Sequence, residues 1–220
     1  MPVPVLTIDG PSGAGKGTVS RLAAKRLGWH YLDSGAIYRA LGLAAVQAGL
    51  DLHDSAGVCG VAAEMQLHFD CGDVFTVRLN GLDVTTQLAG ETAGKNASLI
   101  AADPAVRQAL FQKQMDFRRP PGLVADGRDM GSVVFPDAAY KVFLTASSEQ
   151  RALRRYKQLK EKGIDANLIQ IRSEIEQRDQ RDRERAVAPL VAPEGALYLD
   201  SSDLSIEQAL ESVLNLVRGD

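Results

Sequence analysis

The sequence predicts an α/β fold in which helices flank a parallel five-stranded sheet. Short apolar runs such as 3–8 and 123–125 are typical of buried parallel strands. Segments with helical periodicity alternate with these runs, and a glycine-rich loop joins the first run to the first helix. A chain of 220 residues is long enough for one such unit with an insertion.

The glycine-rich loop has the spacing of a phosphate-binding loop, Gly-x4-Gly-Lys, between a strand and a helix. Its glycines let successive backbone N–H groups converge at the positive end of the helix, where phosphate oxygens bind. The lysine can reach the outer phosphates of a nucleotide. The predicted ATP-binding residues are Gly10, Pro11, Ser12, Gly13, Ala14, Gly15, Lys16, Gly17 and Thr18.

The remaining elements follow in order, with an insertion between the second and third strands of the core. Core strands are expected at 29–32, 123–125, 140–144 and 197–199, and helices outside the insertion at 16–27, 34–48, 147–162, 167–185 and 205–217. The core comprises 1–50, 120–155 and 186–220. The insertion, 51–119, contains helices at 55–65, 91–102 and 104–117 and short strands at 67–69, 75–79 and 82–84. Asn80-Gly81 is a hairpin turn sequence between the last two of these strands.

Bulk properties exclude several classes of protein. The net charge of −3 argues against general nucleic-acid binding. No stretch approaches the ~20 apolar residues of a membrane span. Cys59 and Cys71 lack metal-ligand spacing, and we expect both to be reduced thiols. The sequence thus favours a cytoplasmic protein, and without a long exposed apolar stripe we expect a monomer.

The helix at 167–185 carries an unusual charge pattern. At about 100° per residue, Arg178, Arg181, Asp182 and Arg185 share one face. Two interpretations stay open. The face is either solvated and laced with i,i+4 pairs such as Glu174–Arg178, or it binds a phosphoryl group as a lid (156–185), for which Gly163 offers a hinge.

Three further stretches extend the pattern beyond a phosphate loop. They are Leu32-Asp33-Ser34-Gly35-Ala36-Ile37-Tyr38-Arg39, Ala125-Asp126-Gly127-Arg128-Asp129-Met130-Gly131 and Arg178-Asp179-x-Arg181-Asp182-x-x-Arg185. Together with the loop, they closely resemble the bacterial cytidylate (CMP/dCMP) kinases over nearly the whole chain. Asp33 or Ser34 can also cap the helix that follows, and this interpretation stays open beside a role in binding.

The resemblance implies a nucleoside-monophosphate site within the insertion and an arginine-rich lid. Ser34, Ser98, Arg128, Asp129 and Asp182 are implied in contacts with cytosine or sugar. Arg39, Arg107 and Arg128 are implied around the CMP phosphate, and Arg178 and Arg185 near the transferring group. The implied catalytic residues are therefore Lys16, Arg128, Arg178 and Arg185, and the implied CMP-binding residues are Ser34, Arg39, Ser98, Arg107, Arg128, Asp129, Arg178, Asp182 and Arg185.

The expected reaction is ATP-dependent phosphorylation of CMP and dCMP. Gly17 stands where many phosphate loops have a metal-binding hydroxyl, so we expect magnesium to be held through ATP and waters, with no direct protein ligand. A kinase for another small metabolite and a nucleotide-sensing phosphate-loop protein are the alternatives. The chain lacks the Asn-Lys-x-Asp motif of guanine-binding switches.

Overall fold

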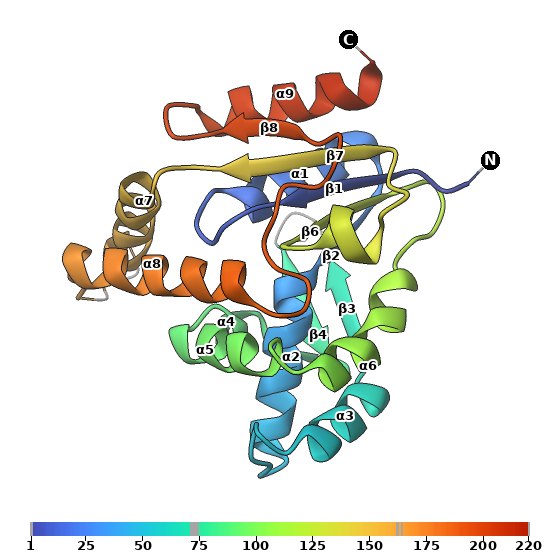
Figure 1. Cartoon of the computed structure of the whole chain (residues 1–220), viewed down its shortest axis with the longest axis vertical. Coiled ribbons are helices and arrows are strands. Elements are labelled where there is room, and N and C mark those ends of the chain that lie inside the picture. The colour runs from blue at the N-terminus through green and yellow to red at the C-terminus, as the bar shows by residue number, and fades with distance from the viewer. Residues whose placement is uncertain (1, 71–74, 162, 164, 220) are drawn as a thin grey trace.

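A parallel five-stranded sheet forms the core of the protein, as a computed structural model shows (Figure 1). The structure describes residues 2–70, 75–161, 163 and 165–219. The strand order is β2-β6-β1-β7-β8, and all four neighbouring pairs are parallel. The strands are β1 (Val5–Asp9), β2 (His30–Asp33), β6 (Leu123–Gly127), β7 (Tyr140–Thr145) and β8 (Leu197–Asp200). This arrangement confirms the predicted parallel core.

Helices cover the sheet because its central strands have no exposed side. Every residue of β1 and β6 is buried, which is why both strands are mainly apolar in sequence. Helix α1 (Lys16–Leu27) ends at Gly28 in the left-handed conformation, and α9 (Ile206–Arg218) begins with a capping box made by Ser205 and Gln208. Helices α1 and α9 pack against each other.

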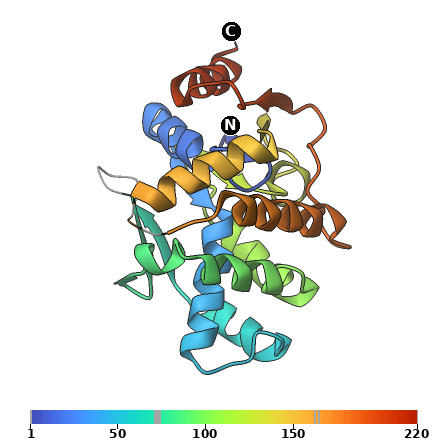
Figure 2. The same ribbon diagram turned by 90° about the vertical axis from the view of Figure 1, so that its left-hand side faces the viewer.

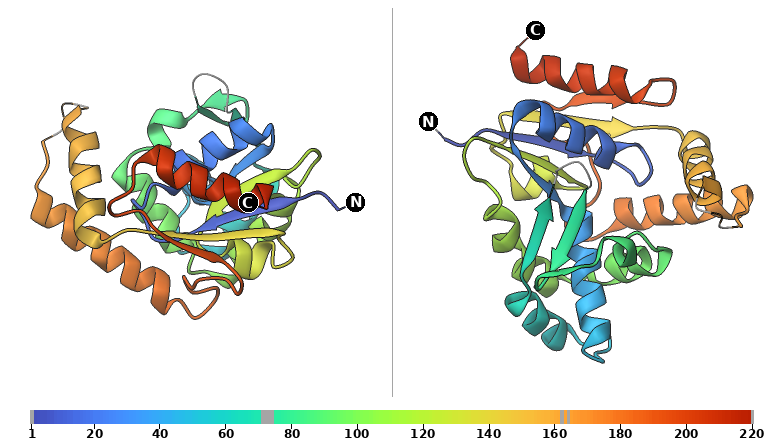
Figure 3. Two further views of the ribbon diagram at one scale, coloured as in Figure 1. Left: turned by 90° about the horizontal axis from the view of Figure 1, so that it is seen from above. Right: turned by 180° about the vertical axis from the view of Figure 1, so that it is seen from behind.

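The predicted insertion contains a three-stranded antiparallel sheet, β3-β4-β5, whose first two strands lie side by side in the right-hand view of Figure 3. Asn80 and Gly81 both have positive φ, as a tight hairpin turn requires. Helix α2 (Ser34–Gln47) precedes the insertion, whose elements include α3 (Ser55–Glu64), β3 (Leu67–Asp70), β4 (Thr76–Leu79), β5 (Leu82–Asp83), α5 (Glu91–Ile100) and α6 (Pro104–Met115).

Two short helices were not predicted. Helix α4 (Thr85–Leu88) begins where the sequence suggested the end of a strand, because the carboxylate of Asp83 binds the backbone N–H and hydroxyl of Thr85 and turns the chain. The π-helix η1 (Met130–Val134) follows β6 directly. The predicted helix ends at 102 and 117 are two residues too long, and the end predicted at Lys162, like Cys71, falls outside the described residues.

Two long helices, α7 (Ser148–Glu161) and α8 (Leu168–Glu184), follow β7 and pack against each other. In Figures 1 and 2, α8 runs between the sheet and α5 of the insertion. Because the five strands are parallel, the loops that follow β1, β2 and β6 all leave the same edge of the sheet. The described part of the chain contains no helix with the length and apolar character needed to span a bilayer.

A substitution at Gly10 tests how closely the loop after β1 packs against the backbone of β7. It has φ of +147°, and a Cβ there would lie 1.9 Å from the backbone oxygen of Leu144. We expect Gly10→Ala to lower the free energy of unfolding in urea by about 3 kcal/mol or more, through strain and overlap together. Gly60→Ala is the control, because that helical glycine has open space around it. It should raise stability by about 0.5–1 kcal/mol, and equal effects of the two changes would contradict the close fit.

Candidate active site

The phosphate-binding loop connects β1 to α1 and has the conformation that its glycines permit. Gly13 and Gly15 have φ of +79° and +95°, a backbone region that side chains disfavour. Lys16 begins α1 and is 5% exposed. Its Nζ donates to the carbonyl oxygen of Pro11 at 2.9 Å and lies 3.9 Å from Asp126 Oδ1. The lysine therefore curls back over its own loop.

Two arginines of α7 support this loop from behind, and sequence reasoning gave neither a role. Arg151 donates to the carbonyl oxygens of Ser12 and Ala146 and to the carboxylate of Asp179 on α8. Arg154 donates to the carbonyl oxygen of Ala14. With its carbonyl oxygens held on this side, the loop leaves its N–H groups for a ligand. The Arg151–Asp179 pair is almost fully buried, so it also ties α8 to the loop.

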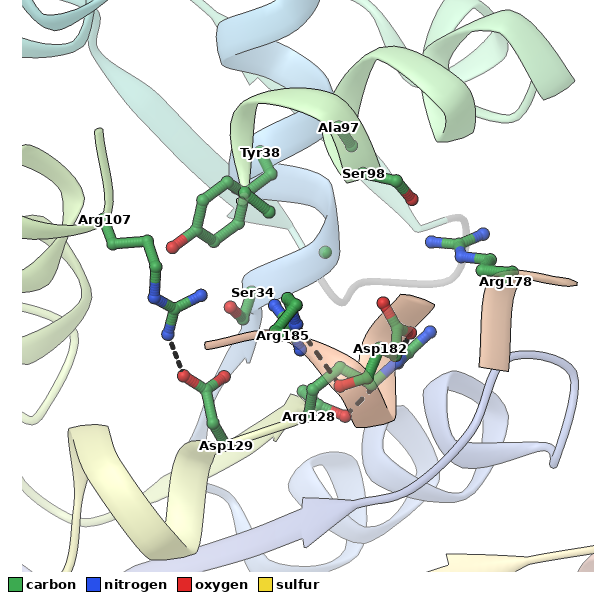
Figure 4. A pocket seen from close by; sticks show the side chains of 13 residues that line it. Ser34, Tyr38, Ala97, Ser98, Arg107, Arg128, Asp129, Arg178, Asp182 and Arg185 are labelled. Atoms are coloured by element: carbon green, nitrogen blue, oxygen red, sulfur yellow. Dashed lines mark hydrogen bonds and ion pairs between the residues drawn. The ribbon is translucent and has the colours of Figure 1, made fainter. Parts of the chain in front are cut away.

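A cavity beside the loop gathers residues from five elements (Figure 4). It is lined by Ser34, Gly35, Tyr38, Ala97, Ser98, Ala101, Arg107, Gly127, Arg128, Asp129, Arg178, Asp182 and Arg185. Eight of the nine residues that the resemblance implied for CMP binding are in this lining. The ninth, Arg39, lies outside it and donates to Asp33 at 3.2 Å. The cavity thus brings together residues that are spread over the sequence from position 34 to position 185.

The cavity has more positive than negative groups. Four guanidinium groups line it against two carboxylates, those of Asp129 and Asp182. Arg107 donates to Asp129, and Arg128 Nε donates to Asp182 Oδ2 at 2.9 Å. These pairs leave Arg178 and Arg185 without a carboxylate partner in the described part of the chain. Arg178 Nε and Arg185 Nη2 are buried without a hydrogen-bond acceptor. Buried donors of this kind are costly unless an anion joins them.

The pKa shifts reflect the same excess of positive charge. Burial, followed by the charge of Arg128, lowers the pKa of Arg178 to about 10. Burial also lowers the pKa of Arg185. Burial favours the neutral acid of Asp182, but Arg128, Arg178 and Arg185 together outweigh it, and the pKa of this carboxyl falls below its usual value. The cavity is therefore an environment in which a further negative charge is favoured.

Most of the charged face of α8 points into the cavity and not toward solvent. Asp182 pairs with Arg128, which follows β6, and the suggested i,i+4 pairs of Arg178 are not among the interactions of the described residues. The helical wheel placed Arg181 with the cavity residues, but this side chain is exposed and donates to the carbonyl oxygen of Gln177. The helix is turned so that Arg178, Asp182 and Arg185 face inward.

Sequence reasoning missed several buried polar groups at this edge. Ser34 donates to Gln114 Oε1 at 2.7 Å, and Gln114 extends the stripe of Val106 and Leu110 on the buried side of α6. A polar residue on an apolar stripe is the sequence pattern that points to it. Burial raises the pKa of Asp126 to about 6, and this carboxylate accepts from Tyr31.

The fold and the site define a phosphate-loop protein with a second, cationic cavity next to the loop. Comparisons with known proteins agree with this class. A family model described as cytidylate kinase matches residues 6–219. The chain is 57% identical to the cytidylate kinase of Methylococcus capsulatus over 98% of this chain and 97% of the relative. It is 54% identical to that of Stutzerimonas stutzeri, over 98% and 96%. The chain belongs to the cytidylate kinase family.

A solved structure of an uncharacterized protein from Eubacterium ventriosum covers 99% of both chains with a TM-score of 0.50 and 9% identity. At this identity the likeness extends to the fold alone. The specific assignment therefore depends on the family match and on the geometry of the cavity.

The buried amine of Lys16 gives the loop a pH dependence. Burial, followed by the charge of Arg128, lowers its pKa to about 8, so the amine loses its charge as pH rises through 8. We expect the affinity for ATP, measured by calorimetry, to fall by up to about tenfold for each pH unit above 8. In Lys16→Arg the side chain stays charged above pH 8, so we expect this fall in affinity to disappear. We also expect the affinity of this variant for ATP at pH 7 to be lower than that of the wild type. An unchanged affinity of the wild-type protein for ATP up to pH 10 would contradict the assignment of Lys16 to ATP binding.

Proposed function

We propose that the protein is a cytoplasmic, monomeric enzyme that transfers the γ-phosphoryl group of ATP to CMP and dCMP. The observation that carries the proposal is the cationic cavity beside the phosphate loop. Its buried guanidinium groups without acceptors, Arg178 Nε and Arg185 Nη2, suit a second phosphate that faces the one held by the loop. Family membership supports the choice of cytidine nucleotides.

The chemistry of the cavity residues suggests which of them would contact the base, the sugar and the phosphate of CMP. A cytosine amine needs an acceptor, and Asp129 has free acceptor capacity besides its bond to Arg107. The Ser98 hydroxyl lies across the cavity from Asp129 (Figure 4). Asp182 suits the sugar hydroxyls. Uracil would put a carbonyl oxygen against the carboxylate, a mismatch that typically costs about 1–3 kcal/mol.

In this proposal the phosphoryl group passes in line from ATP to an oxygen of the CMP phosphate. That oxygen is already anionic, so no general base is required, and catalysis consists of positioning and charge stabilisation. Arg39, Arg107 and Arg128 hold the CMP phosphate, while Lys16, Arg178 and Arg185 meet the migrating charge. The segment 156–185 acts as the lid over residues 51–119, the nucleoside-monophosphate-binding part.

Magnesium fits the donor set beside the loop. Mg²⁺ prefers oxygen ligands and keeps several waters, and Asp126 offers a carboxylate next to Lys16. Asp126 would hold waters of an ion that is bound chiefly by ATP. When bound, the ion neutralises charge between the phosphates. Among the described residues, no group of three or more His, Cys, Asp and Glu forms a metal site of its own.

The direct test is a coupled assay of ADP release with CMP, dCMP, UMP and AMP in turn. We expect turnover with CMP and dCMP and at least about tenfold lower kcat/KM with UMP, because the base edge no longer matches Asp129. Equal turnover of all four, or turnover with AMP alone, would reject the cytosine assignment. Binding of CMP without any phosphorylation would favour the alternative of a nucleotide-sensing protein.

Arg178 and Arg181 form a matched pair on α8, since they are one turn apart and only the first lines the cavity. We expect Arg178→Ala to lower kcat about 10²-fold or more, because it removes positive charge from the transferring group. Arg181→Ala should leave kcat within about twofold. Both variants should unfold at nearly the wild-type temperature. A wild-type rate in Arg178→Ala would remove α8 from the mechanism.

A further inference from the structure

Asp9 is a fully buried carboxylate that the proposed mechanism does not use. It is the last residue of β1, immediately before the phosphate loop, and it has no exposed surface. Burial raises its pKa to about 7, although two backbone N–H groups act in the opposite direction. Both of these N–H groups belong to the segment after β6. Oδ1 accepts from Met130 N and Oδ2 from Gly131 N, each at 2.8 Å.

These two bonds satisfy the beginning of the π-helix η1, which starts at Met130 with Asp129 as its N-cap residue. An aspartate at an N-cap normally uses its own carboxylate to accept from the first free N–H groups. Asp33, Asp54 and Asp103 do so at the starts of α2, α3 and α6. Asp129 makes no such bond, and the carboxylate of Asp9 accepts from the N–H groups of Met130 and Gly131 instead.

The consequence is that the carboxylate of Asp129 stays free for the cavity. It lines the cavity and binds Arg107, with its remaining oxygen lone pairs available (Figure 4). The backbone around it is fixed as well. A Cβ on Gly131 would lie 2.6 Å from Thr7 Oγ1, so η1 is packed tightly on β1.

We propose that Asp9 is a specificity-positioning residue, which caps η1 in place of Asp129 and so keeps the Asp129 carboxylate in the cavity to recognise the substrate's base. This inference rests on the proposed function. Because Asp9 also precedes Gly10, it links the loop that holds one nucleotide to the segment that selects the other.

The variant Asp9→Asn tests the proposal. Asparagine keeps one acceptor oxygen but places an NH₂ group against the second N–H, which then competes for the carboxylate of Asp129. We expect KM for CMP to rise about tenfold and the preference for CMP over UMP to fall by a similar factor, with KM for ATP changing less than about threefold. Equal increases in both KM values, or an unchanged preference, would overturn the proposal.

Thr7→Val is the matched control, because Thr7 lies two residues earlier on β1, is equally buried and has a hydroxyl without a partner. It should leave both KM values unchanged. A second control is Asp9→Asn in an Asp129→Ala background, where the preference for CMP should no longer respond to residue 9. A further loss of preference in that background would show that Asp9 does not act through Asp129.

Amide exchange of the wild-type protein gives an answer that does not require Asp9→Asn to fold. The N–H groups of Met130 and Gly131 should exchange as slowly as those within β1, and fast exchange of both would overturn the proposal. If the wild-type enzyme used CMP and UMP equally, the proposed function would fail by itself. The capping by Asp9 would then be judged by exchange alone.

Discussion

Positive charge buried at one edge of the sheet is the constraint on which the site depends. Four guanidinium groups cannot share one cavity with two carboxylates unless the surrounding chain holds them there. The two ion pairs, Arg107–Asp129 and Arg128–Asp182, offset part of the repulsion. The uncompensated remainder favours an anionic ligand, and the cavity lies beside a loop built to hold phosphates.

The supports for this arrangement come from outside the motifs. Arg151 reaches from α7 to the carbonyl oxygen of Ser12 and to Asp179 of α8, so the loop and the helix with the inward-facing arginines share one buried side chain. On the other side, Asp9 connects the start of the loop with η1. Each support is a buried ionisable group with two or more hydrogen bonds, the condition under which such a group is tolerated in a core.

Much of the fold and of the site could be predicted from local patterns. The Gly-x4-Gly-Lys loop, the apolar runs of β1 and β6 and the Asn80-Gly81 turn each depend on neighbouring residues, and the structure contains all of them. The helical wheel put Arg178, Arg181, Asp182 and Arg185 on one face of α8, and the structure places three of them in the cavity lining and leaves Arg181 exposed. Helical spacing gives the relative angles of side chains, whereas packing decides which part of the arc is buried. Arg39 pairs with Asp33 outside the cavity lining, so its expected contact with the phosphate stays a prediction.

The sequence by itself determined the family, the phosphate loop and eight of the residues that line the cavity, because motif spacing and residue chemistry are local properties. Only the tertiary structure decided their partners. It paired Arg128 with Asp182 across 54 positions and gave Asp9 the capping role that Asp129 would otherwise have. Partners that lie far apart in the sequence depend on how strands and helices pack. The sequence alone does not give the distances between such residues.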